Sequence, residues 1–301
     1  MCIAVATYVL APAWSVLIAA TAVLIAGAGF VDVGVNAYAS HAGSVRHLGL
    51  LHSAYGIGTL RGPLLAAGVL VVAAPWMVVY VVLLAIELPL LLALVRARSG
   101  WPRVADAVDA VANGRSRAPR REMWPALVVF FVYVGTEIGI GQWAYTSLTE
   151  GRGLATAEAG LAVAGHFGGI LTGRLLVAAA GDRIGATTLV RSGLVLALAG
   201  AVLLSLWIDA VIGCVGLAII GVGLAPVFPL LVALTPSGTA AQAAQGVGLR
   251  FAAGALGACT LPSAAGLLLQ HVALTALGPA ALGVIGALLV FHVVLPTAET
   301  S

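Results

Sequence analysis

The sequence predicts an all-α protein whose helices cross a membrane many times. Of the 301 residues, 61% are hydrophobic and only 8% are charged, whereas roughly 25% of the residues in an ordinary soluble domain are charged. A soluble globule would have too few charges to cover its surface, so the composition excludes a soluble enzyme, a nucleic-acid-binding protein and a disordered chain. The apolar residues also form runs of about 20, the length of a spanning helix.

Nine of these runs are long enough to span a bilayer, and a shorter apolar piece, residues 1–11, precedes them. At 1.5 Å per residue the shorter piece cannot cross a hydrocarbon core of roughly 30 Å. The nine predicted spans are residues 14–38, 48–73, 76–95, 124–147, 159–180, 187–208, 210–235, 242–270 and 273–295.

The arginines predict how the spans are oriented. All 14 basic residues are arginines, and cytoplasmic loops of membrane proteins are enriched in basic residues. If the polar, arginine-rich segment 96–123 is cytoplasmic, the outer loops hold only Arg152 and the inner loops hold most of the others. The C-terminus is then cytoplasmic. The lack of lysine, whose codons are rich in A, suggests a bacterial gene and hence the inner membrane.

An internal repeat divides the chain into two halves. A pattern of glycines ending in proline, from Gly27 to Pro63, returns about 200 residues later between Gly221 and Pro262, and internal repeats are typical of transporters. We therefore expect an incomplete N-terminal half at 1–95, a cytoplasmic linker at 96–123 and a complete six-helix half at 124–301. About 70 residues of the first half are then missing from the start; the alternative is a protein of nine or ten helices that never had them.

Several motifs are similar to those of a known transporter family. They are residues 27–36 (GAGFVDVGVN), 50–58 (LLHSAYGIG) with Gly62-Pro63, 133–143 (YVGTEIGIGQW), Gly173-Arg174 with 181–185 (GDRIG), and 223–229 (GLAPVFP). In these motifs the chain resembles the major facilitator superfamily and, within it, the fucose-permease-like sugar transporters. The resemblance covers nearly the whole chain. It implies a twelve-helix bundle, of which this chain holds a remnant of helix 3, helices 4–6 and helices 7–12.

Asp32 and Asn36 lie one turn apart on the same face of a predicted span. A carboxyl group inside a membrane is costly to bury and is therefore a functional candidate. In the sugar permeases that the chain resembles, an acidic residue at this position takes part in proton coupling, which implies the same role for Asp32. The alternative is a structural acid that hydrogen-bonds to a neighbouring helix.

Glu137 lies about 20 Å into its predicted span, near the membrane midplane, and Gln142 and Trp143 follow it. An acid, an amide and an indole could together hydrogen-bond to a sugar or polyol and stack against it. The alternative is a structural glutamate that pairs across the two halves. The residue types favour neither interpretation over the other.

Two histidines, a tyrosine and two residues of a later span are further candidates for a central cavity. His52 shares a helix face with Tyr55, and His166 lies in another predicted span. Histidine titrates near neutral pH, which suits proton transfer, but for each of the two the alternative is a packed, hydrogen-bonded side chain. Gln245 and Arg250 lie near the start of the span at 242–270.

Charged residues also predict contacts that hold the helices together. Arg61 and Glu87 have similar predicted depths on successive spans, which favours a structural ion pair. The alternative is that Arg61 selects an anionic substrate.

One loop between two spans carries a charge pattern. The charged residues of this loop and of the span ends beside it are Arg174, Asp182, Arg183 and Arg191. The family resemblance implies that they gate the protein by latching its outward-facing state. The alternative is the ordinary excess of positive charge in a cytoplasmic loop.

Motifs of enzymes and of metal sites are absent from the sequence. The three cysteines are far apart, at Cys2, Cys214 and Cys259, and show no spacing typical of zinc ligands or of a disulfide framework. No nucleophile elbow, phosphate-binding loop, zinc-protease motif or dinucleotide fingerprint occurs. We expect no enzymatic activity, no cofactor and no metal.

These features together predict a secondary transporter that moves a small polar solute, such as a sugar, in symport with a proton. Its partners are then the solute, H⁺ and the lipid bilayer, without nucleic acid, and its oligomeric state stays open. Efflux of a drug or metabolite is one alternative, and a non-transporting remnant or membrane scaffold is another. A channel is disfavoured because no residues suggest a selectivity filter or a pore ring.

Overall fold

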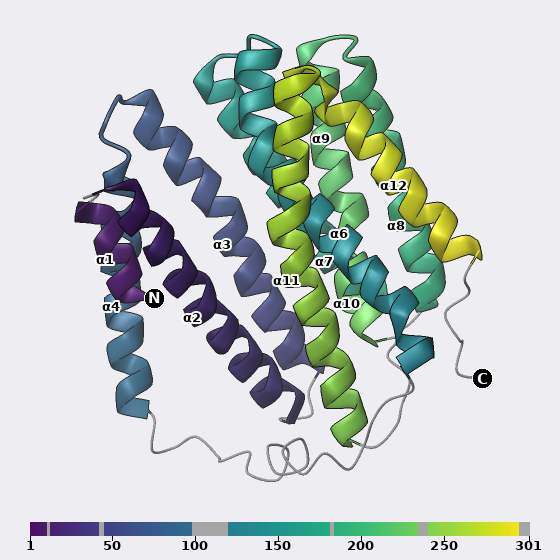
Figure 1. Cartoon of the computed structure of the whole chain (residues 1–301), viewed down its shortest axis with the longest axis horizontal. Helices are drawn as coiled ribbons and strands as arrows, with labels where there is room; N and C mark the ends of the chain where they lie inside the picture. Colours follow the sequence, from purple (N-terminus) through teal and green to yellow (C-terminus); the bar gives the residue numbers. More distant parts are fainter. Residues whose placement is uncertain (11–12, 42–44, 98–119, 181–183, 234–239, 295–301) are drawn as a thin grey trace. The chain divides into compact units, whose positions relative to one another are not determined.

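The computed structural model of the chain contains only helices among the residues that it describes (Figure 1). The backbone is described for residues 1–10, 13–41, 45–97, 120–180, 184–233 and 240–294. Side chains are described for the same residues except 33–41, 45–53, 55, 120–122, 178, 180, 231–233, 240–245 and 247. These helices confirm the prediction of an all-α protein. The physical reason is that a spanning segment must satisfy its backbone hydrogen bonds internally, which a helix does.

Eight helices within the described residues are long and apolar enough to cross a membrane. They coincide with eight of the nine predicted spans. The ninth, 48–73, lies on α3 (Val45–Val71), whose described apolar stretch is the shorter Gly56–Val71. The short piece at 1–11 forms α1 (Cys2–Leu10), a helix too short to span. The chain is therefore a multi-pass membrane protein.

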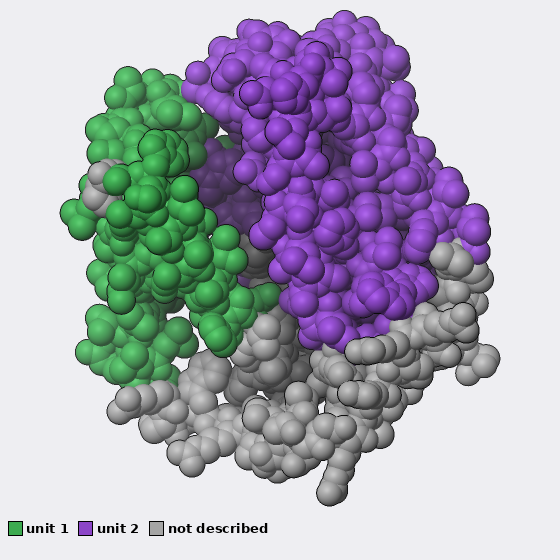
Figure 2. All heavy atoms as spheres, viewed as in Figure 1, with its two compact units in different colours: residues 1–52, 64–105 green, residues 53–63, 106–301 purple. Residues whose placement is uncertain are grey.

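The chain separates into two compact units (Figure 2). Unit 1 comprises Met1–His52 and Leu64–Ala105, and unit 2 comprises Ser53–Pro63 and Asp106–Ser301. Helix α3 therefore contributes its two ends to unit 1 and its middle to unit 2. The halves at 1–95 and 124–301 were predicted from a repeat in the sequence, whereas the two units are defined by packing. The halves therefore stay a prediction.

Unit 1 is organised around α1, which packs against α2 (Trp14–His41) and α4 (Met77–Ala97). The ring of Tyr8 on α1 stacks on Tyr80 of α4 with the ring centroids 4.5 Å apart. The hydroxyl groups of Tyr8 and of Thr21 on α2 are joined by a hydrogen bond. A single tyrosine thus connects three helices.

Unit 2 holds the remaining helices. They are α6 (Arg120–Thr146), η2 (Ser147–Gly151), α7 (Thr156–Ala180), α8 (Ala186–Leu206), α9 (Ala210–Leu224), α10 (Val227–Ala233), α11 (Ala240–His271), η3 (Leu274–Ala276) and α12 (Leu277–Val294). The most extensive packing joins α6 to α11, α9 to both α7 and α8, and α8 to α12. The polar network described below lies where α6, α7 and α9 meet.

Glycines allow the helices of unit 2 to approach closely. A Cβ added to Gly135 on α6 would lie 2.6 Å from the carbonyl oxygen of Gly257 on α11. Likewise, a Cβ added to Gly200 on α8 would lie 2.6 Å from the carbonyl oxygen of Gly216 on α9. No side chain fits at these distances. Because lipid solvates apolar side chains as well as a protein interior does, such close backbone packing is a main source of helix association in a bilayer.

Polar contacts hold the turns around the start of α9. Trp207 ends α8 in the left-handed conformation, with φ of 45°. The guanidinium of Arg152 lies 4.5 Å from the centre of the Trp207 ring, and burial there lowers the pKa of Arg152. The carboxylate of Asp209 then caps α9 by accepting a hydrogen bond of 2.8 Å from the Ile212 N–H. These contacts hold the turn between α8 and α9.

Candidate functional site

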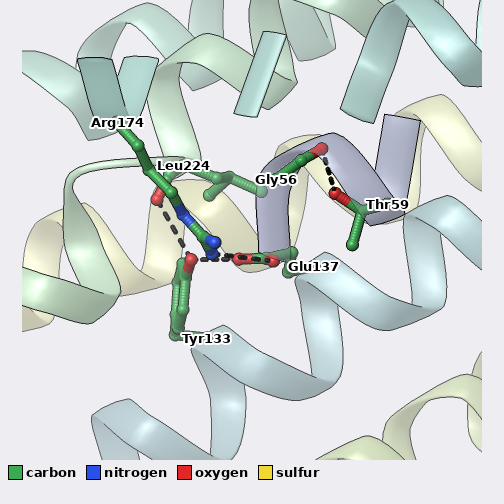
Figure 3. A network of polar contacts seen from close by, with 6 residues as sticks. All are labelled: Gly56, Thr59, Tyr133, Glu137, Arg174 and Leu224. Carbon is green, nitrogen blue, oxygen red and sulfur yellow. Dashed lines mark hydrogen bonds and ion pairs between the residues drawn. The ribbon is translucent and has the colours of Figure 1, made fainter. Parts of the chain in front are cut away.

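A polar network surrounds Glu137 on α6 (Figure 3). Tyr133 lies one turn before Glu137, and its hydroxyl donates a hydrogen bond to the carboxylate Oε2. The same hydroxyl lies 3.1 Å from the carbonyl oxygen of Leu224, the last residue of α9. Residues four apart share one face of a helix, so α6 itself brings Tyr133 to Glu137.

Arg174 on α7 contributes the opposite charge to this network (Figure 3). Its Nη2 lies 3.8 Å from Oε1 of Glu137, and the two side chains are only 11% and 15% exposed. Charges with so little solvent around them interact more strongly than charges on a protein surface. Glu137 thus contacts a tyrosine through one carboxylate oxygen and an arginine through the other, and the charges of Glu137 and Arg174 cancel.

A cavity of about 350 Å³ lies beside Glu137. The residues that line it come from α3, α6 and α7, and they are Thr59, Glu137, Ile138, Gly141, Gln142, Phe167 and Ile170. Apolar walls with a few polar groups, in a volume of roughly 300–1,000 Å³, are typical of binding sites for small molecules. Within the described residues no three His, Cys, Asp or Glu side chains gather as metal ligands would.

Two glycines set the shape of the cavity walls. A Cβ on Gly141 of α6 would lie 2.7 Å from Cζ of Phe167, and a Cβ on Gly56 of α3 would lie 2.7 Å from Cδ1 of Leu171. The Thr59 hydroxyl donates a 3.0 Å hydrogen bond to the Gly56 carbonyl oxygen, so its oxygen offers a ligand an acceptor rather than a donor. Gly56 therefore lets α3 approach Leu171 of α7, and Gly141 lets Phe167 of α7 approach α6.

Glu137, Gln142 and Trp143 were predicted to act together, and the structure separates them. Gln142 lines the cavity with Glu137. Trp143 instead donates a 2.7 Å hydrogen bond from Nε1 to the carbonyl oxygen of Pro262 on α11, with its ring against Gly266. Consecutive residues point about 100° apart around a helix, and here the indole of Trp143 turns toward α11 rather than toward the cavity. Trp143 fastens α6 to α11.

His166 and Arg250, also predicted for the cavity, face other helices. His166 is fully buried, and its Nδ1 lies 3.1 Å from the carbonyl oxygen of Leu217 on α9. Arg250 on α11 is 7% exposed, and its guanidinium lies 5.9 Å from the centre of the Phe130 ring on α6. Both positions are helix interfaces, where a polar side chain is kept only if its surroundings compensate its burial.

The other predicted site residues lie apart from this network or outside the described residues. Asp32 is exposed on α2 of unit 1. Arg61 and Glu87 belong to different units, so their ion pair stays a prediction. The predicted gate is described only at Arg174, which reaches Glu137, and at the half-buried Arg191 of α8. Outside the described side chains or residues lie Asn36, His52, Tyr55, Gln245, Asp182 and Arg183.

Four features of the site are not predicted from the sequence: Tyr133, Thr59, Phe167 and the pairing of Arg174 with Glu137. The spacing of four residues between Tyr133 and Glu137 was a usable signal, because it places both on one helix face. The other three depend on which faces of α3 and α7 turn toward α6. Spans that are apolar on all sides carry little information on that rotation.

The comparison with known proteins assigns the family. The family model of the Major Facilitator Superfamily matches residues 1–262, which is most of the chain. The chain belongs to the Major Facilitator Superfamily. No curated protein matches it. Membership of this superfamily, together with the eight candidate spans, makes the protein a membrane transporter, whereas the resemblance to fucose-permease-like members of the superfamily stays a prediction.

Proposed function

We propose that the protein is a secondary active transporter that moves a small polar solute, such as a sugar, in symport with a proton by alternating access. The observation that carries this proposal is the carboxylate of Glu137, which lines a cavity and contacts both Tyr133 and Arg174. An ionisable group at membrane depth is a functional candidate because its burial is costly. Proton uptake and solute binding then take place at one site.

Protonation of Glu137 changes the hydrogen bonds of the whole network. The ionised carboxylate attracts Arg174 and accepts the proton of the Tyr133 hydroxyl. The protonated acid loses its charge and can itself donate to the hydroxyl oxygen, so Tyr133 then donates to the Leu224 carbonyl oxygen. The charge of Glu137 is thereby linked to contacts of α6, α7 and α9. A ligand or proton shifts a conformational equilibrium only through such differential contacts.

The cavity composition favours a neutral, hydroxylated solute. The amide of Gln142 both donates and accepts hydrogen bonds, the Thr59 oxygen accepts them, and the Phe167 ring offers a surface for the C–H face of a sugar. Because the charges of Glu137 and Arg174 cancel, neither an organic anion nor an organic cation is attracted by a net charge. A sugar or polyol satisfies these requirements.

Further parts of the proposal rest on the resemblance to sugar permeases. Asp32 with Asn36 is the proposed second proton-linked group. The loop flanked by Arg174 and Arg191 is the proposed gate, and it includes Asp182 and Arg183. The proposed orientation follows the positive-inside rule and places the C-terminus in the cytoplasm of a bacterial cell.

Solute-driven proton movement in right-side-out vesicles tests the proposal. Sugars and polyols are added one at a time, and external alkalinisation is recorded for the wild-type chain, for Glu137→Gln and for Glu150→Gln. Glu150 is an exposed acid on η2 and serves as the matched control. We expect alkalinisation with at least one solute, its loss in Glu137→Gln and its retention in Glu150→Gln. Alkalinisation of wild-type size in Glu137→Gln refutes a proton-coupling role for this residue.

Efflux of an amphipathic drug or metabolite is the second candidate function. It is favoured by the apolar share of the cavity wall, which includes Ile138, Phe167 and Ile170. In everted vesicles, proton-driven accumulation of a fluorescent lipophilic dye without any response to sugars would favour efflux. A stably inserted chain that responds to neither class of solute would favour a non-transporting membrane scaffold.

A further inference from the structure

We propose that Arg191 on α8 and His292 on α12 bind the phosphate group of an anionic phospholipid. Neither residue lines the cavity, and neither takes part in the Glu137 network. The proposed lipid site is therefore separate from the solute cavity and from Glu137, and its Arg191 also flanks the proposed gate.

The packing of α8 against α12 is antiparallel in a regular register. Gly278 at the start of α12 approaches Ser205 near the end of α8, where an added Cβ would lie 2.9 Å from the serine Cα. About two turns further along α12, Gly286 faces Leu198, which lies about two turns back along α8, with 3.7 Å between an added Cβ and the leucine Cδ1. Contacting residues on α8 and α12 are therefore spaced alike, about two turns apart on each helix.

The same register brings Arg191 and His292 to about the same level of the two helices. His292 lies about two turns beyond Gly286 on α12, and Arg191 lies about two turns before Leu198 on α8. In agreement with this placement, the guanidinium of Arg191 is near enough for an electrostatic interaction with the His292 ring. The pair lies at the end of unit 2 where α8 begins and α12 ends.

Each of these side chains has a buried nitrogen without a hydrogen-bond partner among the described residues. The atoms are Nε of Arg191 and Nε2 of His292. Only 3% of His292 is exposed. A buried N–H without a partner is costly, and most so on a charged group. The arginine Nε always carries a proton, and the histidine Nε2 carries one in one of its tautomers. Two such donors at the same level of adjoining helices suit one shared acceptor, and an anionic oxygen can accept from both.

The apolar surface around Arg191 and His292 favours a lipid phosphate over a free phosphate as the bound anion. Exposed valines flank the pair on both helices, and they are Val195, Val290, Val293 and Val294. In a membrane such a surface faces acyl chains. Arg191 lies about 7.5 Å along α8 from its first residue, near the level of the lipid headgroups. A cationic group beside lipid-facing apolar surface, between two spanning helices, is the chemistry that recognises an anionic headgroup.

Lipid binding to the purified full-length chain in detergent micelles tests the proposal. Phosphatidylglycerol, phosphatidylcholine and inorganic phosphate are titrated separately, and binding is followed by native mass spectrometry and by the shift in Tm. We expect tighter binding of phosphatidylglycerol than of the other two. Arg191→Gln should weaken that binding about tenfold, the effect of losing one charge-assisted hydrogen bond. Arg96→Gln, at an exposed arginine in the last turn of α4, should leave it unchanged.

A second variant keeps the proposal testable if Arg191→Gln does not fold. His292→Phe removes both ring nitrogens, keeps an aromatic ring and should also weaken phosphatidylglycerol binding. Wild-type binding in a folded Arg191→Gln or His292→Phe variant overturns the proposal. So does inorganic phosphate that binds as tightly as phosphatidylglycerol, because the occupant would then be a free anion and not a lipid.

Discussion

The Glu137 carboxylate on α6 and the Arg174 guanidinium on α7 form an ion pair, with 3.8 Å between Oε1 and Nη2, beside the cavity of unit 2. Two features give the pair its importance. Its side chains are mostly buried, so neither charge is well solvated, and Tyr133 ties the same carboxylate to the end of α9. A change in either charge therefore affects three helices.

Arg174→Gln should destabilise the protein by about 1–3 kcal/mol, because it leaves the Glu137 carboxylate largely buried beside a neutral side chain. The double variant Glu137→Gln/Arg174→Gln should be more stable than Arg174→Gln alone, since both charges are then gone. Thermal unfolding of the four proteins in detergent gives the coupling energy from a double-mutant cycle. Strictly additive effects would show that the two charges do not interact.

Gly141→Ala should impair solute uptake, because the new Cβ would lie 2.7 Å from Cζ of Phe167 and would push that ring into the cavity. We expect uptake at low solute concentration to fall about five- to tenfold, the effect typical of a changed pocket wall. Gly283→Ala on α12 is the matched control, since among the described residues nothing beyond its own stretch of helix lies within 4 Å of the added Cβ. Equal uptake by the two variants would place the solute elsewhere.

Gln142→Ala and Trp143→Phe should differ in kind, although the residues are neighbours. Gln142 lines the cavity, so its truncation should weaken solute affinity with little effect on Tm. Trp143 donates a hydrogen bond to Pro262, so Trp143→Phe should cost about 1 kcal/mol of stability and leave solute affinity intact. Competition binding and thermal unfolding measure the two quantities. The opposite pattern would mean that the indole, and not the amide, contacts the solute.

Gly135→Ala should destabilise the contact of α6 with α11 by about 1–3 kcal/mol through overpacking. Its Cβ would lie 2.6 Å from the Gly257 carbonyl oxygen, which belongs to the backbone and cannot easily move aside. At Gly248 on α11 no described residue beyond the local helix has an atom within 4 Å of an added Cβ, so Gly248→Ala should stabilise the helix by about 0.5–1 kcal/mol. Relative to wild type, we expect Tm to fall in Gly135→Ala and to rise in Gly248→Ala. A neutral Gly135→Ala would contradict close packing of these helices.

The sequence by itself determined the class of the protein and the location of its spans. A bilayer admits few polar residues and requires internal backbone hydrogen bonds, so long apolar runs must become helices. The contact of Tyr133 with Glu137 also follows from the sequence once the helix is known, because four residues complete about one turn. These inferences need only the position of a residue along the chain.

The tertiary structure decided which side chains meet. It paired Arg174 with Glu137, turned Trp143 toward α11, and buried His166 against α9. In water, an amphipathic pattern tells which face of a helix is buried. In lipid, apolar side chains are solvated on every face, so the rotation of each helix about its axis depends on close contacts of small residues and on a few polar pairs. Those contacts exist only when the helices are packed together.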